Sequence, residues 1–198
     1  MAYVRKYQPS DHDAMINIIC PDTTFVLDDG TGKAVGYLLG CPNTQRFAAQ
    51  MQEIFLPALD SSQDVPPPPA GTEAVQFFKD PALWARMELY KNLSTSLVRS
   101  DTPEILKEYP AHLHIDILPS HQSKGYGPKL LDAWEDEMRK LGVRGCHLGM
   151  DPANQAAGRF YKRQGWGVFN ELHGAGVGEE NQRGSSSGGT ILVKRVWS

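Results

Sequence analysis

The sequence predicts an α/β fold in which a sheet of about six to seven strands is flanked by helices. The apolar segment 113–118 is followed by a glycine-bearing turn and then by an amphipathic segment, a pattern typical of strand, turn and helix. A second apolar segment, 145–150, precedes another helical pattern. Near the N-terminus the predicted order is strand, helix, strand, strand. These observations indicate a central sheet with helices packed on it.

The N-terminal elements follow from alternation and turn residues. Residues 3–7 alternate loosely and predict a strand, and 11–20 carry apolar residues at helical spacing. Residues 25–27 and 34–40 are apolar runs joined by the turn-rich segment 28–33, which predicts a hairpin.

The middle of the chain predicts a helical insertion at about 43–110. Helical stripes cover 43–59 and 80–97, and 102–110 predicts a further helical turn. Four consecutive prolines at 66–69 form a stiff polyproline segment, which serves either as a spacer or as a protein-recognition motif.

Two further strands are predicted near the C-terminus, at 168–172 and 190–196. Between them, 174–189 is rich in Gly, Ser and charged residues and predicts a flexible loop. This loop could also act as a lid over a binding site, and the sequence leaves both interpretations open.

Length and composition indicate one domain, 1–198, of an ordinary globular protein, with 40% hydrophobic and 22% charged residues. A formal net charge of −3 argues against nucleic-acid binding. The three cysteines are far apart, so we expect neither a disulfide framework nor a metal site. No apolar run is long enough to span a membrane. We therefore expect a cytoplasmic, or otherwise intracellular or nuclear, protein that is a monomer or a homodimer.

The turn at Gln122–Gly127 carries the first functional signal. A turn with two glycines before a helix leaves several backbone N–H groups free, with the positive end of the helix dipole behind them. Such a site suits a pyrophosphate. The alternative is that the glycines only reverse the chain.

A second motif, 154–166, favours the pyrophosphate site over a turn that only reverses the chain. Gln122, Gly125 and Gly127, together with the Asn-x-x-Ala-x-x-x-Tyr-x-x-x-Gly pattern that starts at Asn154 and includes Tyr161, resemble the GNAT superfamily of N-acetyltransferases. The resemblance implies the GNAT fold, with a central mixed, twisted sheet. It also implies direct transfer of acetyl from acetyl-CoA to a primary amine, with CoA as the product and no metal.

The resemblance also implies which residues hold the cofactor. Backbone groups of the central strand are expected to hold pantetheine and to aim an N–H at the thioester oxygen, and the glycine turn is expected to take the pyrophosphate. The implied cofactor-binding residues are Ile115, Ile117, Leu118, Gln122, Ser123, Lys124, Gly125, Tyr126, Gly127, Asn154 and Tyr161.

The implied catalytic groups are an acid and a base. Tyr161 matches the family's general acid to the leaving sulfur, although a tyrosine in this place could equally be packing. His112, His114 and Asp116 occupy alternate positions and face one side of a regular strand. We expect Asp116, working with His114, to accept the amine's proton. The alternative is an Asp116–His pair that only satisfies itself. Ala111 stands near the start of this strand, where some relatives carry a glutamate that serves as the catalytic base.

The acceptor is predicted from a shorter resemblance. Residues 109–119 resemble the acetyltransferase-like domain of O-GlcNAcase-type proteins and related microbial proteins, which implies an amino-sugar acceptor such as glucosamine or a glucosaminide. A protein or histone lysine is the alternative, and a non-catalytic acetyl-CoA-binding module is a third. Trp84, Glu88 and Tyr90 form either an aromatic, acidic wall for this substrate or part of the core.

Overall fold

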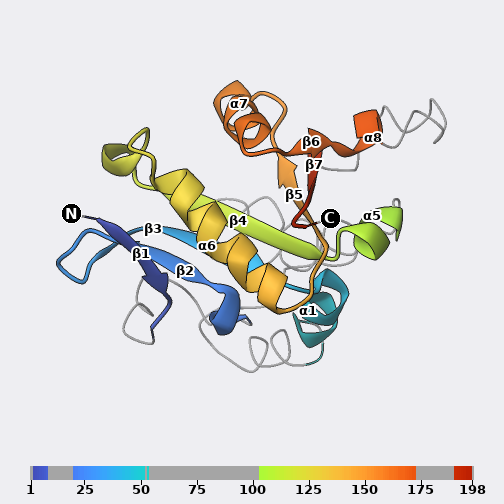
Figure 1. Cartoon of the computed structure of the whole chain (residues 1–198), viewed down its shortest axis with the longest axis horizontal. Helices are drawn as coiled ribbons and strands as arrows, with labels where there is room; N and C mark the ends of the chain where they lie inside the picture. Colours follow the sequence, from blue (N-terminus) through green and yellow to red (C-terminus); the bar gives the residue numbers. More distant parts are fainter. Residues whose placement is uncertain (1, 9–19, 52, 54–102, 173–189, 198) are drawn as a thin grey trace, which may run out of the picture.

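A computed structural model of the chain describes residues 2–8, 20–51, 53, 103–172 and 190–197. These residues form one seven-stranded sheet with the order β1-β2-β3-β4-β5-β7-β6 (Figure 1). The strands are β1 (Tyr3–Lys6), β2 (Phe25–Asp28), β3 (Ala34–Cys41), β4 (Ala111–Ile117), β5 (Gly145–Met150), β6 (Gly167–Val168) and β7 (Thr190–Arg195). The helices are α1 (Thr44–Gln50), α5 (Pro103–Glu108), α6 (Tyr126–Lys140), α7 (Gln155–Arg163) and α8 (Phe169–Leu172), with 3-10 turns η2 (Pro21–Thr23) and η6 (Pro119–His121).

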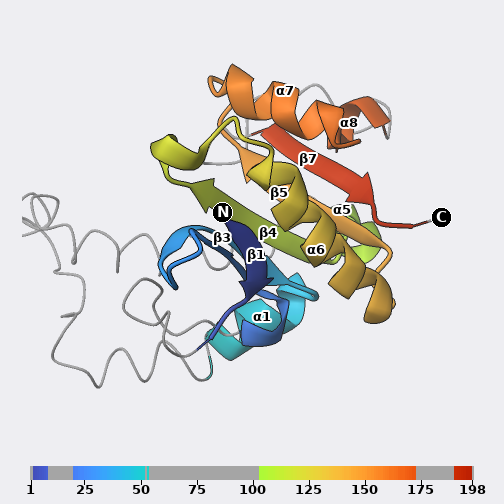
Figure 2. The ribbon, with the colours of Figure 1, turned by 60° about the vertical axis from the view of Figure 1, so that its left-hand side comes forward.

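The centre of the sheet is where its two halves meet. All neighbouring strands are antiparallel except β4 and β5, which are parallel. These two strands pair only at Ala111–Cys146 and His112–His147. Beyond that point β4 continues along β3, while β5 continues along β7. The sheet therefore opens between β4 and β5, and α7 lies beyond the opening (Figures 1 and 2).

Helix α6 covers one face of the β1–β4 half of the sheet (Figure 1). Its fully buried residues are Leu130, Leu131, Trp134 and Met138, which recur at the spacing of one helical face. They pack with Leu27 and Leu38 in the main hydrophobic cluster. Burying a side chain of this size contributes about 2 kcal/mol, so this helix anchors the sheet half that carries β4.

Strand β4 is regular along its whole length. Its register with β3 runs without interruption from Gly36–Ile117 to Cys41–His112. Leu113 is buried on the side of α6, whereas His114 and Asp116 are exposed. Because the strand has no bulge, the polar residues at alternate positions share the opposite face, as the sequence predicts.

Most elements predicted from the sequence are confirmed where the structure describes them. The prediction of a strand at 168–172 is wrong beyond Val168, because the chain turns into the short helix α8. That turn buries Phe169 edge-on against Tyr109, with 6.2 Å between ring centroids. The segments 9–19, 54–102 and 173–189 lie outside the described residues, and so do the predicted helices, polyproline segment and loop that fall within them.

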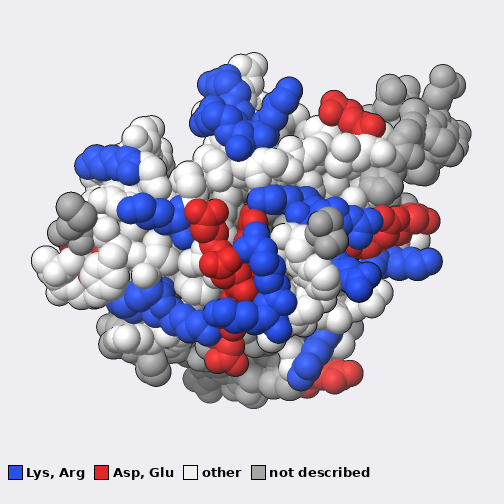
Figure 3. All heavy atoms as spheres, in the orientation of Figure 1, with Lys and Arg blue, Asp and Glu red and all other residues white. Residues whose placement is uncertain are grey.

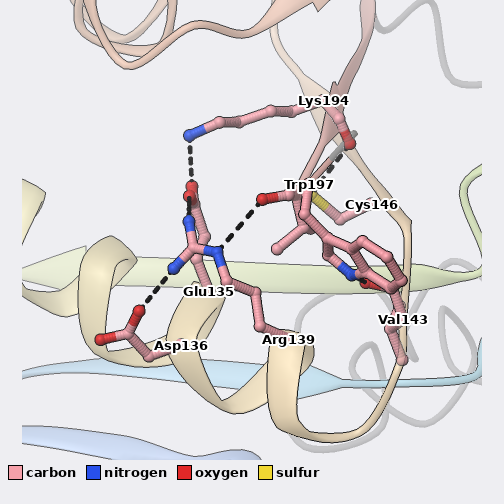
Figure 4. A network of polar contacts seen from close by, with 8 residues as sticks. Glu135, Asp136, Arg139, Val143, Cys146, Lys194 and Trp197 are labelled. Carbon is pink, nitrogen blue, oxygen red and sulfur yellow. Dashed lines mark hydrogen bonds and ion pairs between the residues drawn. The ribbon is translucent and has the colours of Figure 1, made fainter.

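A buried ion pair fastens α6 to β7 in the other sheet half (Figure 4). Lys194 Nζ of β7 lies 2.6 Å from Glu135 Oε1, and the Glu135 side chain is only 4% exposed. Arg139 contacts the second Glu135 oxygen at 3.4 Å, bonds Asp136, and donates from Nε to the carbonyl of Val196 at 3.2 Å. This network links the helix to β7 across the central strands.

Replacing Lys194 by Met should lower the free energy of unfolding by on the order of 3 kcal/mol, because Glu135 would remain buried without its main counter-charge. Denaturant unfolding followed by circular dichroism measures this change. Lys140→Met is the matched control: Lys140 is 69% exposed and Glu137 keeps Lys6 as a second partner, so we expect a loss of about 0.5 kcal/mol. Equal losses in the two variants would contradict the assignment.

Candidate active site

A cleft of about 670 Å³ lies where β4 and β5 separate. One wall is the end of β4 and the turn before α6, and the other is α7. The residues that line it are Ile115, Asp116, Ile117, Gln122, Ser123, Gly125, Gly127, Pro128, Asn154, Ala156, Ala157, Arg159, Phe160, Tyr161, Arg163 and Gln164. The cleft is thus built from both sequence motifs, which the fold brings together.

The turn before α6 is held by its own residues. Gln122 donates from its side-chain amide to the carbonyl of Ile117 at 2.7 Å, which ties the turn to the end of β4. Ser123 and Gly125 adopt left-handed conformations, with φ of 58° and 79°. The first turn of a helix has no internal acceptors for its N–H groups, so this loop directs backbone donors outward at the N-terminus of a 15-residue helix.

Gly127 lies where the start of α6 comes close to α7. A Cβ atom at this position would lie 3.0 Å from the ring of Phe160. The glycine therefore lets the aromatic ring of α7 pack against the start of α6. At Gly125, in contrast, an added Cβ would meet nothing within 4 Å and would point into open space.

Basic side chains surround this end of the cleft. Lys124 and Lys129 are exposed on the turn and the first turn of α6, and Arg159 and Arg163 lie one helical turn apart on α7. Lysine and arginine cover both α7 and the start of α6 in the space-filling view (Figure 3). Although the whole chain is acidic, this rim suits an anionic ligand.

Tyr161 lies in the cleft wall and is 8% exposed. Its ring packs edge-on against Phe160 and Trp166, with centroids 5.0 and 5.6 Å away. Burial raises the pKa of its phenol to about 12. The hydroxyl therefore stays protonated at neutral pH and can donate a hydrogen bond to a developing anion.

Two residues predicted to bind the cofactor, Asn154 and Leu118, occupy different environments in the structure. Asn154 is the N-cap of α7, and its Oδ1 accepts from the N–H of Ala157 at 3.0 Å. Asn154 therefore stabilises the start of α7 and also lines the cleft. Leu118 is 49% exposed, just beyond the end of β4, and is not part of the cleft lining.

The polar face of β4 divides into two environments. Asp116 lines the cleft and accepts from the N–H of Ile117 at 2.8 Å. Burial of Tyr37, together with the nearby charge of Asp116, raises the pKa of the Tyr37 phenol. His114 lies beside Tyr37, with ring centroids 6.0 Å apart. No hydrogen bond joins His114 to Asp116 in the described part of the chain, so the alternative of a self-satisfied pair does not hold for these two residues.

His112 is held at the other end of the strand. Thr44 Oγ1 lies 2.7 Å from both His112 Nδ1 and the carbonyl of Pro110. The hydroxyl donates its one proton to the carbonyl, so Nδ1 of His112 must carry the proton that it donates to Thr44. Sequence spacing gave no sign of this contact, because Thr44 lies 68 positions away.

Several cleft residues were missed by the sequence motifs, among them Arg159, Phe160 and Arg163. Their helical spacing on the exposed side of α7 was the available signal. Trp84, Glu88 and Tyr90, the predicted acceptor wall, lie outside the described residues. Among the described residues, no group of three or more His, Cys, Asp or Glu is arranged to hold a metal ion, and no helix could span a membrane.

Comparison with known proteins agrees with this architecture. Residues 94–166 match the model of the acetyltransferase (GNAT) family. The solved structure of SsHAT is similar over 100% of this chain and 99% of that chain, with a TM-score of 0.73 and 28% identity. A GNAT-family acetyltransferase from Staphylococcus aureus Mu50 has a TM-score of 0.51 at 9% identity, covering 100% of both chains. The yncA protein of Salmonella typhimurium, solved with its cofactor acetyl-CoA, has a TM-score of 0.50 at 14% identity. The similarity covers 100% of this chain and 95% of that chain.

Over residues 94–166 the chain resembles the GNAT family, and the class of protein that this fold and cleft define is that of the acetyl-CoA-dependent N-acetyltransferases. The cleft fits this cofactor in two respects. A turn with outward backbone N–H groups and a basic rim suits phosphates, and the open edge of β4 beyond His112 leaves strand backbone available to an extended chain.

Replacing Gly125 by Asp should weaken acetyl-CoA binding roughly tenfold or more, because a carboxylate would enter the space in front of the N–H groups. Isothermal titration calorimetry measures the affinity. Gly142→Asp is the matched control, since Gly142 also has a left-handed φ of 71° and open surroundings but lies after the C-terminus of α6. Unchanged affinity in Gly125→Asp would remove the turn from the phosphate site.

Proposed function

We propose that this protein transfers acetyl from acetyl-CoA to the primary amine of a small amino sugar, such as glucosamine or a glucosaminide. The observation that carries this proposal is the cleft between β4 and β5, which has a phosphate-type turn at one end and the exposed carboxylate of Asp116 in its lining. The carboxylate suits a cationic amine. The resemblance of residues 109–119 to O-GlcNAcase-type acetyltransferase domains supports the sugar.

Residues of the turn and of β4 would hold the donor, which supplies an activated acetyl thioester. Backbone N–H groups of Ser123, Gly125 and Gly127 would bind the pyrophosphate, with Lys124 and the basic rim neutralising its charge. Ile115 and Ile117 line the cleft with half-buried side chains, and their strand backbone would contact the pantetheine. An N–H preorganised in this strand would stabilise the charge that develops on the thioester oxygen.

Tyr161 would act on the leaving group. Its phenol lies in the cleft wall and is neutral at physiological pH because burial raises its pKa to about 12. A neutral hydroxyl can donate a hydrogen bond to sulfur as negative charge develops there. The packing of its ring on Phe160 and Trp166 fixes the direction of that donor, so a packing role and a functional role are compatible.

Asp116 would accept the proton of the attacking amine, directly or through water. It is the only polar residue of the β4 face that lines the cleft among the described residues, whereas His112 is engaged with Thr44 at the opposite end of the strand. His114 stands next along the same face and would hold the amine or relay the proton. Trp84, Glu88 and Tyr90 are proposed to complete the acceptor side.

Acetyl-CoA turnover against a panel of amines tests the acceptor. Release of free thiol should be fastest with glucosamine or a chitosan oligomer, and slow with polyamines, free lysine and a histone tail peptide. Turnover with the peptide alone would replace the sugar by a protein lysine. Binding of acetyl-CoA without turnover of any of these amines would contradict the proposed reaction and favour a non-catalytic acetyl-CoA-binding module.

Tyr161→Phe should lower kcat by roughly tenfold to a hundredfold, because the leaving sulfur would lose its donor, as is usual for a positioned acid. Acetyl-CoA affinity should stay within about twofold, since the ring packing remains. With a pKa of about 12, the phenol should cause no loss of wild-type activity between pH 9 and about 10.5, where an ordinary tyrosine titrates. Unchanged kcat in the variant would assign Tyr161 to packing.

A further inference from the structure

Two histidines on the face of the sheet opposite α6 are engaged by the protein itself. His112 Nδ1 lies 2.7 Å from Thr44 Oγ1, and His147 Nδ1 lies 2.6 Å from the carbonyl oxygen of Tyr109. The two histidines are partners in register on β4 and β5, at the end where these strands still pair. This end of the face is therefore held together by internal hydrogen bonds.

Three polar side chains at the other end of the same face are arranged differently. Tyr37 of β3 is the direct cross-strand partner of Asp116, and its ring centroid lies 6.0 Å from that of His114. Cross-strand partners of an antiparallel pair point to the same face of the sheet, with Cβ atoms about 5 Å apart. Within the described part of the chain, no other side chain forms a hydrogen bond or an ion pair with Tyr37, His114 or Asp116.

The phenol of Tyr37 is the group of the three that most needs a partner. Tyr37 is half-buried, whereas His114 and Asp116 are exposed to water. A polar group that loses part of its hydration is stabilised only when a hydrogen bond replaces it. Burial, together with the nearby charge of Asp116, raises the pKa of the Tyr37 phenol, so the hydroxyl is protonated at neutral pH and can donate. This donor, beside an exposed carboxylate, is available to a ligand.

The strand order determines which part of a ligand meets Tyr37. Strand β4 lies between β3 and β5, and the cleft lies on the β5 side of Asp116. With the acetyl donor in the cleft, an amine at Asp116 has the thioester on one side and Tyr37 on the other. The rest of the acceptor molecule then lies over β3, where the side chain of Tyr37 stands.

We propose that Tyr37 is an acceptor-binding residue, whose hydroxyl donates a hydrogen bond to a hydroxyl group of the sugar while the amine lies against Asp116. This role of Tyr37 rests on the proposed function and adds to it a residue that recognises the polyol part of the acceptor. A primary amine without hydroxyl groups makes no such contact and leaves the phenol unpaired. Tyr37 therefore favours a polyhydroxylated amine over an aliphatic amine such as a lysine side chain.

Steady-state kinetics of Tyr37→Phe in the intact chain tests this role. The KM for glucosamine should rise roughly fivefold to tenfold, as expected for the loss of one hydrogen bond to the substrate. The kcat at saturating glucosamine and the KM for acetyl-CoA should stay within about twofold of the wild-type values, since neither the reacting groups nor the donor site is changed. Tyr3→Phe is the matched control, because Tyr3 is 50% exposed on the edge strand β1 and should leave all three constants unchanged.

Cyclohexylamine, a cyclic primary amine without hydroxyl groups, separates recognition of the sugar from recognition of the amine. Its inhibition constant against glucosamine should be the same in the wild type and in Tyr37→Phe. An unchanged KM for glucosamine in Tyr37→Phe would overturn the role of Tyr37, and so would an equal loss of affinity for glucosamine and cyclohexylamine. Failure of the wild type to acetylate glucosamine would overturn the proposed function and this role together, so the two failures are distinguishable.

Discussion

The site of this protein depends on the point at which β4 and β5 stop pairing. Only two residue pairs join these parallel strands, after which each follows an antiparallel partner on its own side. A sheet normally satisfies its backbone donors and acceptors through neighbouring strands. Here the edge of β4 beyond His112 faces a cleft, so the break in pairing creates both the space and the backbone groups with which a ligand can bond.

A structure opened at its centre needs other links between its halves. Helix α6 supplies one, because its apolar face covers β1 to β4 while Glu135 and Arg139 reach β7 and the residue after it. The same helix begins at the glycine turn, so its dipole and its first N–H groups face the cleft. One helix thus contributes to stability through its buried face and to ligand binding through its N-terminus.

The proposed chemical tasks lie at different places along the cleft. The end proposed to bind phosphate has backbone donors and basic side chains, and its charge is opposite to that of the chain as a whole. The other end has an exposed carboxylate on β4 and a buried phenol on α7. Burial keeps the phenol of Tyr161 neutral, which is the protonation state that its proposed role requires.

The sequence by itself indicated the resemblance to the GNAT family, most strands and the two motifs of the cleft, because these depend on local alternation, helical spacing and the backbone freedom of glycine at Gly125 and Gly127. It also placed His114 and Asp116 on one face, since β4 is regular. It failed at 168–172, where burial of Phe169 against Tyr109 outweighs local strand preference.

Only the tertiary structure decided which distant residues meet. Thr44 holds His112, Lys194 neutralises Glu135, and Arg159 and Arg163 of α7 line the cleft. Each contact joins segments that lie far apart in sequence, and local patterns carry no information about such pairs. The physical reason is that strand order and register set the distances between these residues. Strand order and register in turn result from the packing of the whole sheet.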